Sequence, residues 1–299
     1  MKAKILKLIG IIVFTCILIA VIVVSEIKSI PALGSIFGTF FGFAIQAVYK
    51  NFQDLSDKEQ WEITQRKLQR GKIITPEEIV RISFAYLFRI KVGDKYLLVK
   101  NERGTNKYQP VGGVYQVYGD EKTKLKELFH VIDDSKIPID KSSKNDYRMQ
   151  LQNRYLRQFI ARFDNEANRE NVNNLGREFK EEIIEKKILD WDHIEYRFCG
   201  RHISDLTYGN HFRCYELLLA DIVEILPTEK QYNDLEKLIT TQSDIYRFAT
   251  AEEIKSLGIN TREGILEEKI ADHTQKILQE NENYLISMPY DNKHFSINI

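Results

Sequence analysis

The chain has 299 residues with 43 basic and 43 acidic side chains, so its formal net charge is zero. Residues 1–50 hold five of the basic and one of the acidic residues, which leaves 38 basic and 42 acidic residues, a net charge of −4, in residues 51–299. This balance excludes an overall field that recruits nucleic acid, and the three cysteines lack zinc-ligand spacing and suit a reducing compartment.

Two consecutive apolar runs of membrane length occupy the first fifty residues. Residues 8–24 contain no charge, and together with residues 5–7 they form a helix of about 30 Å, with Lys7 reaching back to the interface. A second run follows, and the five residues between the two runs permit only a tight hairpin. We therefore predict transmembrane helices over about 5–24 and 30–49.

The charges that flank this hairpin predict its orientation. Basic residues precede the first run and directly follow the second, namely Lys2, Lys4, Lys7 and Lys50. The positive-inside rule then predicts a multi-pass protein of the cell inner membrane whose N- and C-termini are both cytoplasmic. The alternative is a secretory signal peptide followed by a buried helix. It is disfavoured because the second run is as long as the first and no Ala-x-Ala-like cleavage site stands near Val24.

Glycine recurs every four residues in the second run, at Gly34, Gly38 and Gly42. This spacing places the three glycines on one helix face, where a second backbone can approach closely. We predict that this face packs against another helix, either within the hairpin or between chains of a homo-oligomer. Chance is the alternative, since small residues are common in membrane helices.

Residues 51–75 are typical of a polar connecting segment, with a helix over 52–71, and residues 76–299 of one folded domain. Alternation of apolar residues predicts a β-hairpin from 82–92 and 95–100. The later elements that we expect are helices at 147–163, 173–188, 251–257 and 262–283, and strands at 193–203, 210–224 and 244–249. Strands and helices alternate without a regular βαβ rhythm, which favours a mixed-sheet α/β sandwich.

The strongest chemical signal is the run Arg177-Glu178-Phe179-Lys180-Glu181-Glu182-Ile183. In a helix, Glu178 lies one turn before Glu181 and Glu182, so three carboxylates share one face. Like charges at these spacings destabilise a helix, and a hard cation such as Mg²⁺, itself bound to phosphates, would relieve the repulsion. A carboxylate face that is simply solvated is the alternative.

This run resembles the second half of the Nudix box, whose pattern is Gly, five residues, Glu, seven residues, Arg-Glu-apolar-x-Glu-Glu-x-Gly-apolar. The strand at 96–100 followed by Pro110-Val111-Gly112-Gly113 resembles the strand and Pro-Gly-Gly segment that lead into the box, and residues 248–254 resemble the segment before the last Nudix helix. The resemblance covers about residues 80–280. It implies a Nudix-like mixed-sheet α/β sandwich with a long insertion, preceded by the two-helix transmembrane hairpin.

The same resemblance implies roles for individual residues. Mg²⁺ is the cofactor that it implies, held by Glu178, Glu181 and Glu182 with Arg177 orienting one of them, and no other cofactor is expected. If the chain were a hydrolase, Glu178 and Glu181 would be its catalytic residues.

Three departures from the Nudix pattern favour ligand sensing over hydrolysis. Between Gly113 and Arg177 stand 63 residues where the box has 13, which indicates an insertion at about 114–172. The first glutamate of the box has no counterpart at the expected distance, where Tyr118 or Gly119 stands, and the late glycine is Ile184. The hydrolytic site is therefore rebuilt, and we expect binding to persist where hydrolysis does not.

Arginines near the insertion are candidates for nucleotide binding, because the guanidinium fork pairs with phosphates. Arg148 and Arg169 lie outside the apolar stripe of the predicted helix at 147–163, and Arg201-His202 at a strand end would line the same cleft. The predicted nucleotide-binding set is therefore Arg148, Arg169, Arg177 and Arg201. The alternative for the segment at 147–163 is an amphipathic helix that only covers the core.

Two N-terminal membrane helices joined to a Nudix-like domain with a long insertion resemble the SMODS-associated Nudix family, the transmembrane-Nudix effectors of CBASS anti-phage systems. The resemblance implies that the domain senses a cyclic oligonucleotide made by a cognate nucleotidyltransferase on phage infection, and that the membrane helices then assemble, disrupt the inner membrane and kill the cell. The competing interpretation is a membrane-tethered Nudix hydrolase that cleaves a nucleoside diphosphate-linked substrate. A structural tether whose domain binds protein is a third.

Overall fold

The computed structural model describes residues 2–28, 31–56, 59–101, 105–137, 143–165, 168–260, 265–266 and 269–299. The chain divides into two compact units, Met1–Ile73 and Ile74–Ile299. The first is entirely helical, and the second is a mixed α/β domain. The α/β class that the sequence predicts is therefore confirmed.

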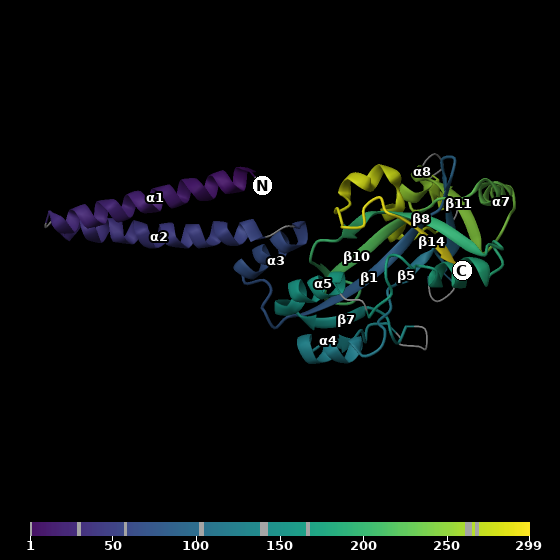
Figure 1. Ribbon diagram of the computed structural model, residues 1–299, viewed down its shortest axis with the longest axis horizontal. Coiled ribbons are helices and arrows are strands. Elements are labelled where there is room, and N and C mark those ends of the chain that lie inside the picture. The colour runs from purple at the N-terminus through teal and green to yellow at the C-terminus, as the bar shows by residue number, and fades with distance from the viewer. Residues whose placement is uncertain are drawn as a thin grey trace. The chain divides into compact units, whose positions relative to one another are not determined.

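The first unit consists of α1 (Lys2–Ile27), α2 (Pro31–Ser56) and α3 (Gln60–Arg70). α1 and α2 lie side by side along their length (Figure 1). α2 runs seven residues beyond the predicted end at Tyr49, because the polar residues that follow contain neither glycine nor proline to stop it. The expected single connecting helix over 52–71 is thus divided between α2 and α3. Ser29 of the predicted turn and Ile30, the predicted first residue of the second helix, lie outside the described residues.

One helix among the described residues is long and apolar enough to cross a membrane, the segment Leu6–Ile27 of α1. Many of its large apolar side chains are exposed in the isolated chain. Within the part of the chain that the structure describes, no second helix has the length and hydropathy needed to cross a membrane. A multi-pass anchor therefore does not follow from the structure itself.

The glycine repeat contributes little to the contact between α1 and α2. A Cβ atom added to Gly34 would lie 3.5 Å from the Ser25 Oγ, whereas Cβ atoms on Gly38 and Gly42 would meet nothing within 4 Å. Only Gly34 therefore faces α1. The two later glycines leave a stretch of α2 uncovered within the chain.

The second unit is built on a mixed eight-stranded sheet with the order β14-β8-β10-β1-β7-β6, where β5 also pairs with β1 and β9 with β10. Its two central strands, β1 and β10, are parallel, and β8 runs antiparallel to β10. The strand bounds are β1 Ile79–Arg89, β5 Gly112–Val114, β6 Ile132–Asp133, β7 Arg148–Gln152, β8 His193–Ile203, β9 Thr207–Gly209, β10 Cys214–Ile225 and β14 His294–Asn298.

A smaller sheet and several helices complete the domain. The smaller sheet has the order β11-β3-β2 with β4 on β3, and β12 pairs separately with β13. These strands are β2 Lys91–Val92, β3 Lys95–Lys100, β4 Tyr108–Gln109, β11 Tyr246–Thr250, β12 Ile259–Asn260 and β13 Ile265–Leu266. The helical elements are α4 Glu121–Phe129, η1 Asn153–Tyr155, α5 Leu156–Asn165, α6 Arg177–Phe179, η2 Lys180–Ile184, α7 Glu229–Ile239, α8 Ala251–Lys255, η3 Asp272–Ile277 and η4 Gln279–Tyr284.

The two faces of β1 differ in character because successive side chains point to opposite sides of a sheet. Phe84, Tyr86 and Phe88 form one face, where Phe84 stacks on Phe163 of α5 with ring centroids 3.9 Å apart. The opposite face carries Ser83, Ala85 and Leu87. Its Leu87 end is covered by the smaller sheet and by η3, in a cluster that includes Tyr96, Ile222, Ile277 and Leu278.

Two predicted helices differ from the structure. Residues 148–152 of the expected helix at 147–163 form β7 instead, because Met149 and Leu151 alternate with polar residues and pair with the free edge of β1, whereas residues 156–163 are helical as part of α5. The long helix expected at 262–283 is also wrong over its described part, where two short 3₁₀ helices, η3 and η4, are separated by the extended residue Leu278. Leu278 and Ile277 are both buried in the cluster beneath the smaller sheet, which a continuous helix through the polar residues 279–284 could not achieve.

Candidate functional site

The acidic run Arg177–Ile184 forms a short helix packed against the aromatic face of the sheet. It begins as three residues of α-helix, α6, and continues as a π-helical turn, η2, in which the Glu185 amide donates to the Lys180 carbonyl at 2.9 Å. Phe179 and Ile183 are fully buried, and Phe179 stacks on Trp191 and meets the edge of Phe88. The apolar stripe therefore anchors the helix and leaves its carboxylates at the edge of the sheet. Single π turns of this kind are frequent at functional sites.

The guanidinium of Arg177 lies among these carboxylates. Its Nη1 donates to Glu178 Oε1 at 2.5 Å and lies 3.7 Å from Glu181 Oε1. Its Nη2 donates to the Val114 carbonyl at 2.8 Å and to Glu170 Oε2 at 3.1 Å. The surrounding negative charges outweigh the effect of burial and raise the pKa of Arg177, so the side chain is a permanent cation within the acidic cluster.

Glu170 is a site residue that the sequence interpretation missed. Its carboxylate is 2% exposed, pairs with Arg177, and also accepts from the Tyr86 hydroxyl at 3.0 Å and from the Gln116 amide at 3.3 Å. Six residues separate Glu170 from Arg177, where the Nudix pattern has seven between its first glutamate and its arginine. The sequence predicts this counterpart near Tyr118, at the start of the insertion, whereas the structure supplies it from Glu170, near the end of the insertion.

The two glycines of the Pro-Val-Gly-Gly segment lie directly against the acidic helix. Gly112 has φ +146°, and an added Cβ would lie 2.2 Å from the Tyr86 carbonyl oxygen, while its amide donates to Glu182 Oε2 at 3.0 Å. A Cβ on Gly113 would lie 2.0 Å from Glu178 Oε1. Gly112 needs to be glycine because the backbone of β1 occupies the space of a side chain, and at Gly113 the Glu178 carboxylate occupies that space. The structure thus joins the two halves of the Nudix pattern across the insertion.

The carboxylates do not converge as a metal-ligand set in this arrangement. Among the described residues, no group of three or more His, Cys, Asp or Glu side chains is placed to hold a metal ion. Glu178 is bound to Arg177, and Glu182 is bound to the Gly112 amide. The Arg177 guanidinium therefore neutralises part of the charge of these carboxylates, and the binding of Mg²⁺ by Glu178, Glu181 and Glu182 stays a prediction.

Two of the four predicted ligand arginines are occupied inside the core. Arg169 is 3% exposed, donates to the carbonyls of Phe163 and Glu170 at 2.7 and 2.6 Å, and lies over the Phe163 ring. Arg201 is 3% exposed and binds Asp221 through Nε at 2.6 Å and Asp164 through Nη1 at 2.6 Å. Internal acceptors therefore engage both guanidinium groups, and a contact of Arg169 or Arg201 with a ligand stays a prediction.

Arg148 is placed differently. It lies in β7, opposite Ser83 of β1, and its one described ion pair is with Asp146 at a distance of 3.6 Å. Its Nε is buried without a hydrogen-bond partner. Burial lowers the pKa of Arg148, and the charge of Asp146, followed by the charges of Asp134 and Glu178, partly offsets that effect. It remains a candidate ligand residue together with Arg177.

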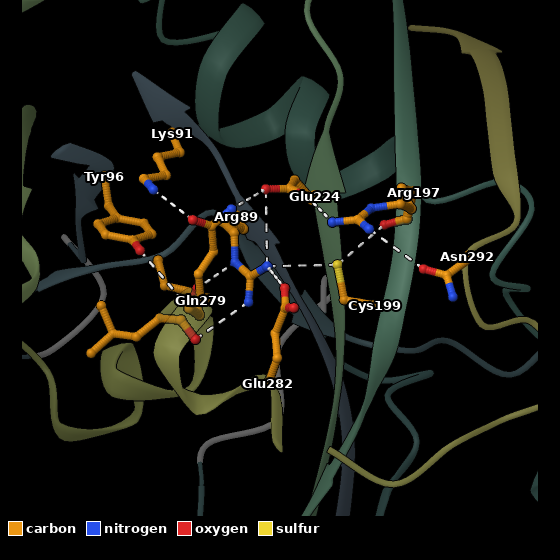
Figure 2. Close-up of polar contacts among 11 residues, drawn as sticks. Arg89, Lys91, Tyr96, Arg197, Cys199, Glu224, Gln279, Glu282 and Asn292 are labelled. Carbon is orange, nitrogen blue, oxygen red and sulfur yellow. Dashed lines mark hydrogen bonds and ion pairs between the residues drawn. The ribbon is translucent and has the colours of Figure 1, made fainter. Parts of the chain in front are cut away.

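A buried arginine at the end of β1 holds η3 and η4 against the sheet (Figure 2). Arg89 is fully buried, and its Nε and Nη2 donate to the carbonyls of Ile277 and Leu278 at 2.5 and 3.4 Å. Its Nη1 pairs with Glu282 and lies 3.9 Å from Glu224 Oε1. Figure 2 shows the guanidinium between Cys199 of β8, Glu224 of β10 and Glu282 of η4. Arg89 therefore helps to hold η3 and η4 against the sheet, together with the burial of Ile277 and Leu278.

The comparison with protein families matches residues 79–278 to the SMODS-associated NUDIX domain. The comparison with curated proteins found no match. The matched segment begins at β1, includes β5, the insertion and the acidic helix, and ends after η3. It covers about two thirds of the sequence, and it contains the Gly-Gly segment, Glu170 and the Arg177 cluster. The chain belongs to the SMODS-associated NUDIX family.

Proposed function

We propose that this chain is a membrane-anchored effector of a CBASS antiviral system, in which the Nudix-like domain senses a cyclic oligonucleotide made on phage infection. The observation that carries the proposal is the match of residues 79–278 to the SMODS-associated NUDIX domain, in a chain whose first helix is apolar enough to cross a membrane. The long segment between Gly113 and Arg177, and Ile184 in place of the late glycine of the Nudix pattern, favour ligand binding over hydrolysis.

The membrane part of the proposal is that both α1 and α2 cross the inner membrane, with both termini in the cytoplasm. α1 is apolar enough for this role, and α2 is a continuous helix of 26 residues that runs along α1. Large apolar side chains of α2 are exposed in the isolated chain, as a lipid-facing surface requires, including Ile36, Phe40, Phe43 and Ile45.

The output step is assembly of several chains through these helices, followed by disruption of the membrane. Gly38 and Gly42 support this step because α1 does not cover them, which leaves a close-packing face for another chain. The ligand must bind the assembled state more tightly than the resting state, since differential affinity is all that shifts such an equilibrium. The cognate nucleotidyltransferase is then a functional partner that needs no physical contact.

The test uses the full chain in lipid nanodiscs. Calorimetry across cyclic di- and trinucleotides measures binding, and a phosphate-release assay with nucleoside diphosphate-linked substrates plus Mg²⁺ or Mn²⁺ measures hydrolysis. We expect at least one cyclic oligonucleotide to bind and turnover to be poor. Rapid turnover without cyclic-oligonucleotide binding would instead establish the competing function, a membrane-tethered Nudix hydrolase.

A further inference from the structure

We propose that Tyr118 is a stacking platform for a nucleobase of the ligand, at the edge of the cluster that Arg177 forms with Glu170, Glu178 and Glu181. The inference rests on the proposed function for the class of ligand, an oligonucleotide with unpaired bases. It goes beyond that function because it assigns the recognition of a base to one residue of the insertion. The Nudix pattern would place a carboxylate, and not an aromatic ring, near this position.

Strand pairing places Tyr118 beside the buried Glu170. Val117 and Arg169 form an antiparallel bridge, and the Glu170 amide donates to the Gln116 carbonyl at 2.8 Å. Gln116 therefore lies opposite Glu170, and directly opposed residues project to the same side of a pair of strands. Tyr118 is two residues beyond Gln116 and projects to that same side, about 7 Å along the strand. A base on Tyr118 is thus about one nucleotide away from the cluster.

The burial of the neighbouring side chains agrees with this alternation. Tyr115 and Val117 point to the other side and are buried, with the Tyr115 ring against the edge of Phe163 in α5. Tyr118, by contrast, is 47% exposed. Its ring therefore faces away from the aromatic core, where a flat ligand can cover it.

The backbone fixes the position of the ring before a ligand binds. The Tyr118 amide donates to the Asn168 carbonyl at 2.8 Å, and the Tyr118 carbonyl accepts from the Glu121 amide, at the start of α4, at 3.2 Å. Gly119 follows with φ +56°, and a Cβ added there would meet nothing within 4 Å, so the turn after Tyr118 leaves open space on that side. A ring whose backbone is already held loses less conformational entropy on binding.

The charges around Tyr118 favour a base over a phosphate. Glu170 lies on the same side, and Glu178 and Glu181 lie beside Arg177. Carboxylates repel a phosphate that arrives without a cation, but they do not repel a neutral base. Burial, followed by the charge of Glu170, raises the pKa of Tyr118, and Arg177 opposes this effect, so the ring remains an uncharged phenol at neutral pH. Since every base has a π face, the platform contributes affinity for a base of any identity.

The first experiment measures the affinity of the full chain in nanodiscs for cyclic di- and trinucleotides by calorimetry. Tyr118→Ala and Tyr118→Phe are compared with Tyr284→Ala, whose parent side chain is 72% exposed on η4. Stacking predicts that Tyr118→Ala binds at least about fivefold more weakly than the parent, whereas Tyr118→Phe, which keeps the ring, and Tyr284→Ala bind within about twofold of it. Thermal melting confirms that all three variants are folded.

The second experiment reports contact between the ring and the base directly. Tyr118→Trp and Tyr284→Trp each add one indole to a chain that has two tryptophans. We expect a cyclic oligonucleotide that binds the chain to quench the added fluorescence of Tyr118→Trp and to leave that of Tyr284→Trp unchanged. A purely structural role of Tyr118 does not predict this quenching.

Failure of this inference is distinguishable from failure of the proposed function. If a cyclic oligonucleotide binds the parent and Tyr118→Ala equally, or if Tyr118→Phe binds as weakly as Tyr118→Ala, the sensor stands and stacking on Tyr118 is overturned. If no cyclic oligonucleotide binds the parent, the proposed function fails, and ADP-ribose serves as the probe of the platform. Quenching of Tyr118→Trp alone by ADP-ribose supports a platform for another nucleotide, and equal or absent quenching overturns it.

Discussion

Replacing Glu170 with alanine tests the internal charge cluster most sharply. The carboxylate is 2% exposed and satisfies Arg177, the Tyr86 hydroxyl and the Gln116 amide at 3.1, 3.0 and 3.3 Å. Removing one partner of a buried ion pair costs about 3–5 kcal/mol, because the other charge is left uncompensated. Arg177 is 23% exposed and keeps Glu178 and the Val114 carbonyl, which limits that cost.

A second effect also moves the expected loss of stability toward the lower end of the range of about 3–5 kcal/mol. Burial raises the pKa of Glu170, so the ionised carboxylate is itself costly in the folded state, and its removal recovers part of that cost. We therefore expect Glu170→Ala to lower the free energy of unfolding by about 3 kcal/mol. For a domain of this size the melting temperature should fall by roughly 6–12 °C.

The assay is unfolding of the full chain in detergent, followed by the fluorescence of Trp191, which stacks on Phe179 of the acidic helix. Glu195→Ala is the matched control, because Glu195 is exposed on β8, and its loss should change stability by less than about 0.5 kcal/mol. If Glu170→Ala unfolds like the control, Glu170 does not anchor Arg177 and the assignment of this residue to the Nudix cluster is refuted.

Three further predictions follow from single positions. Gly113→Ala should displace the flexible Glu178 carboxylate from Arg177 and thereby reduce the ligand affinity measured by calorimetry, while the melting temperature changes by only a few degrees. An unchanged ligand affinity would mean that the position of Glu178 is irrelevant to binding. Gly38→Leu meets open space within the chain, so it should preserve expression and ligand binding and abolish ligand-dependent crosslinking of chains; crosslinking at the parental level would show the glycine face to be incidental. Burial raises the pKa of Cys199 to about 11, so roughly one part in a thousand of its thiol is ionised at pH 8. Alkylation of Cys199, followed by mass spectrometry, should therefore be far slower in the folded chain than in the unfolded chain. Equal alkylation rates in the two states would contradict the burial of Cys199.

Elements with strong alternation could be predicted from the sequence, and they form the frame of the domain. The strands over 193–203 and 244–249 appear close to their predicted limits as β8 and β11. The predicted hairpin of 82–92 with 95–100 forms only in part, because β1 pairs within the larger sheet and only β2, Lys91–Val92, pairs with β3. The side chains of these strands alternate between buried and exposed positions or are continuously apolar, so local sequence determines them. The strand β7 was predicted as helix because its five residues are stabilised by pairing with β1, a contact that local periodicity does not report.

The candidate site was only partly predictable for a related reason. The acidic helix and the Gly-Gly segment were identified because their residues are contiguous in the sequence. Glu170 was missed because the insertion moved it to a different distance from Gly113, and only the fold returns it to Arg177. Arg169 and Arg148 look alike in sequence, yet Arg169 is enclosed by Phe163 and carbonyl groups, whereas Arg148 lines a pocket beside Asp146, a distinction that depends on tertiary packing.

Dye release from vesicles tests the central claim most directly. The full chain would be reconstituted into liposomes that contain a self-quenched dye, and cyclic di- and trinucleotides would be added one at a time, with their linear counterparts as controls. The account predicts that a cyclic oligonucleotide that binds the chain triggers release, and that its linear counterpart does not. Binding of that ligand without any release, or release that is independent of the ligand, would contradict the claim that sensing by the Nudix-like domain drives disruption of the membrane.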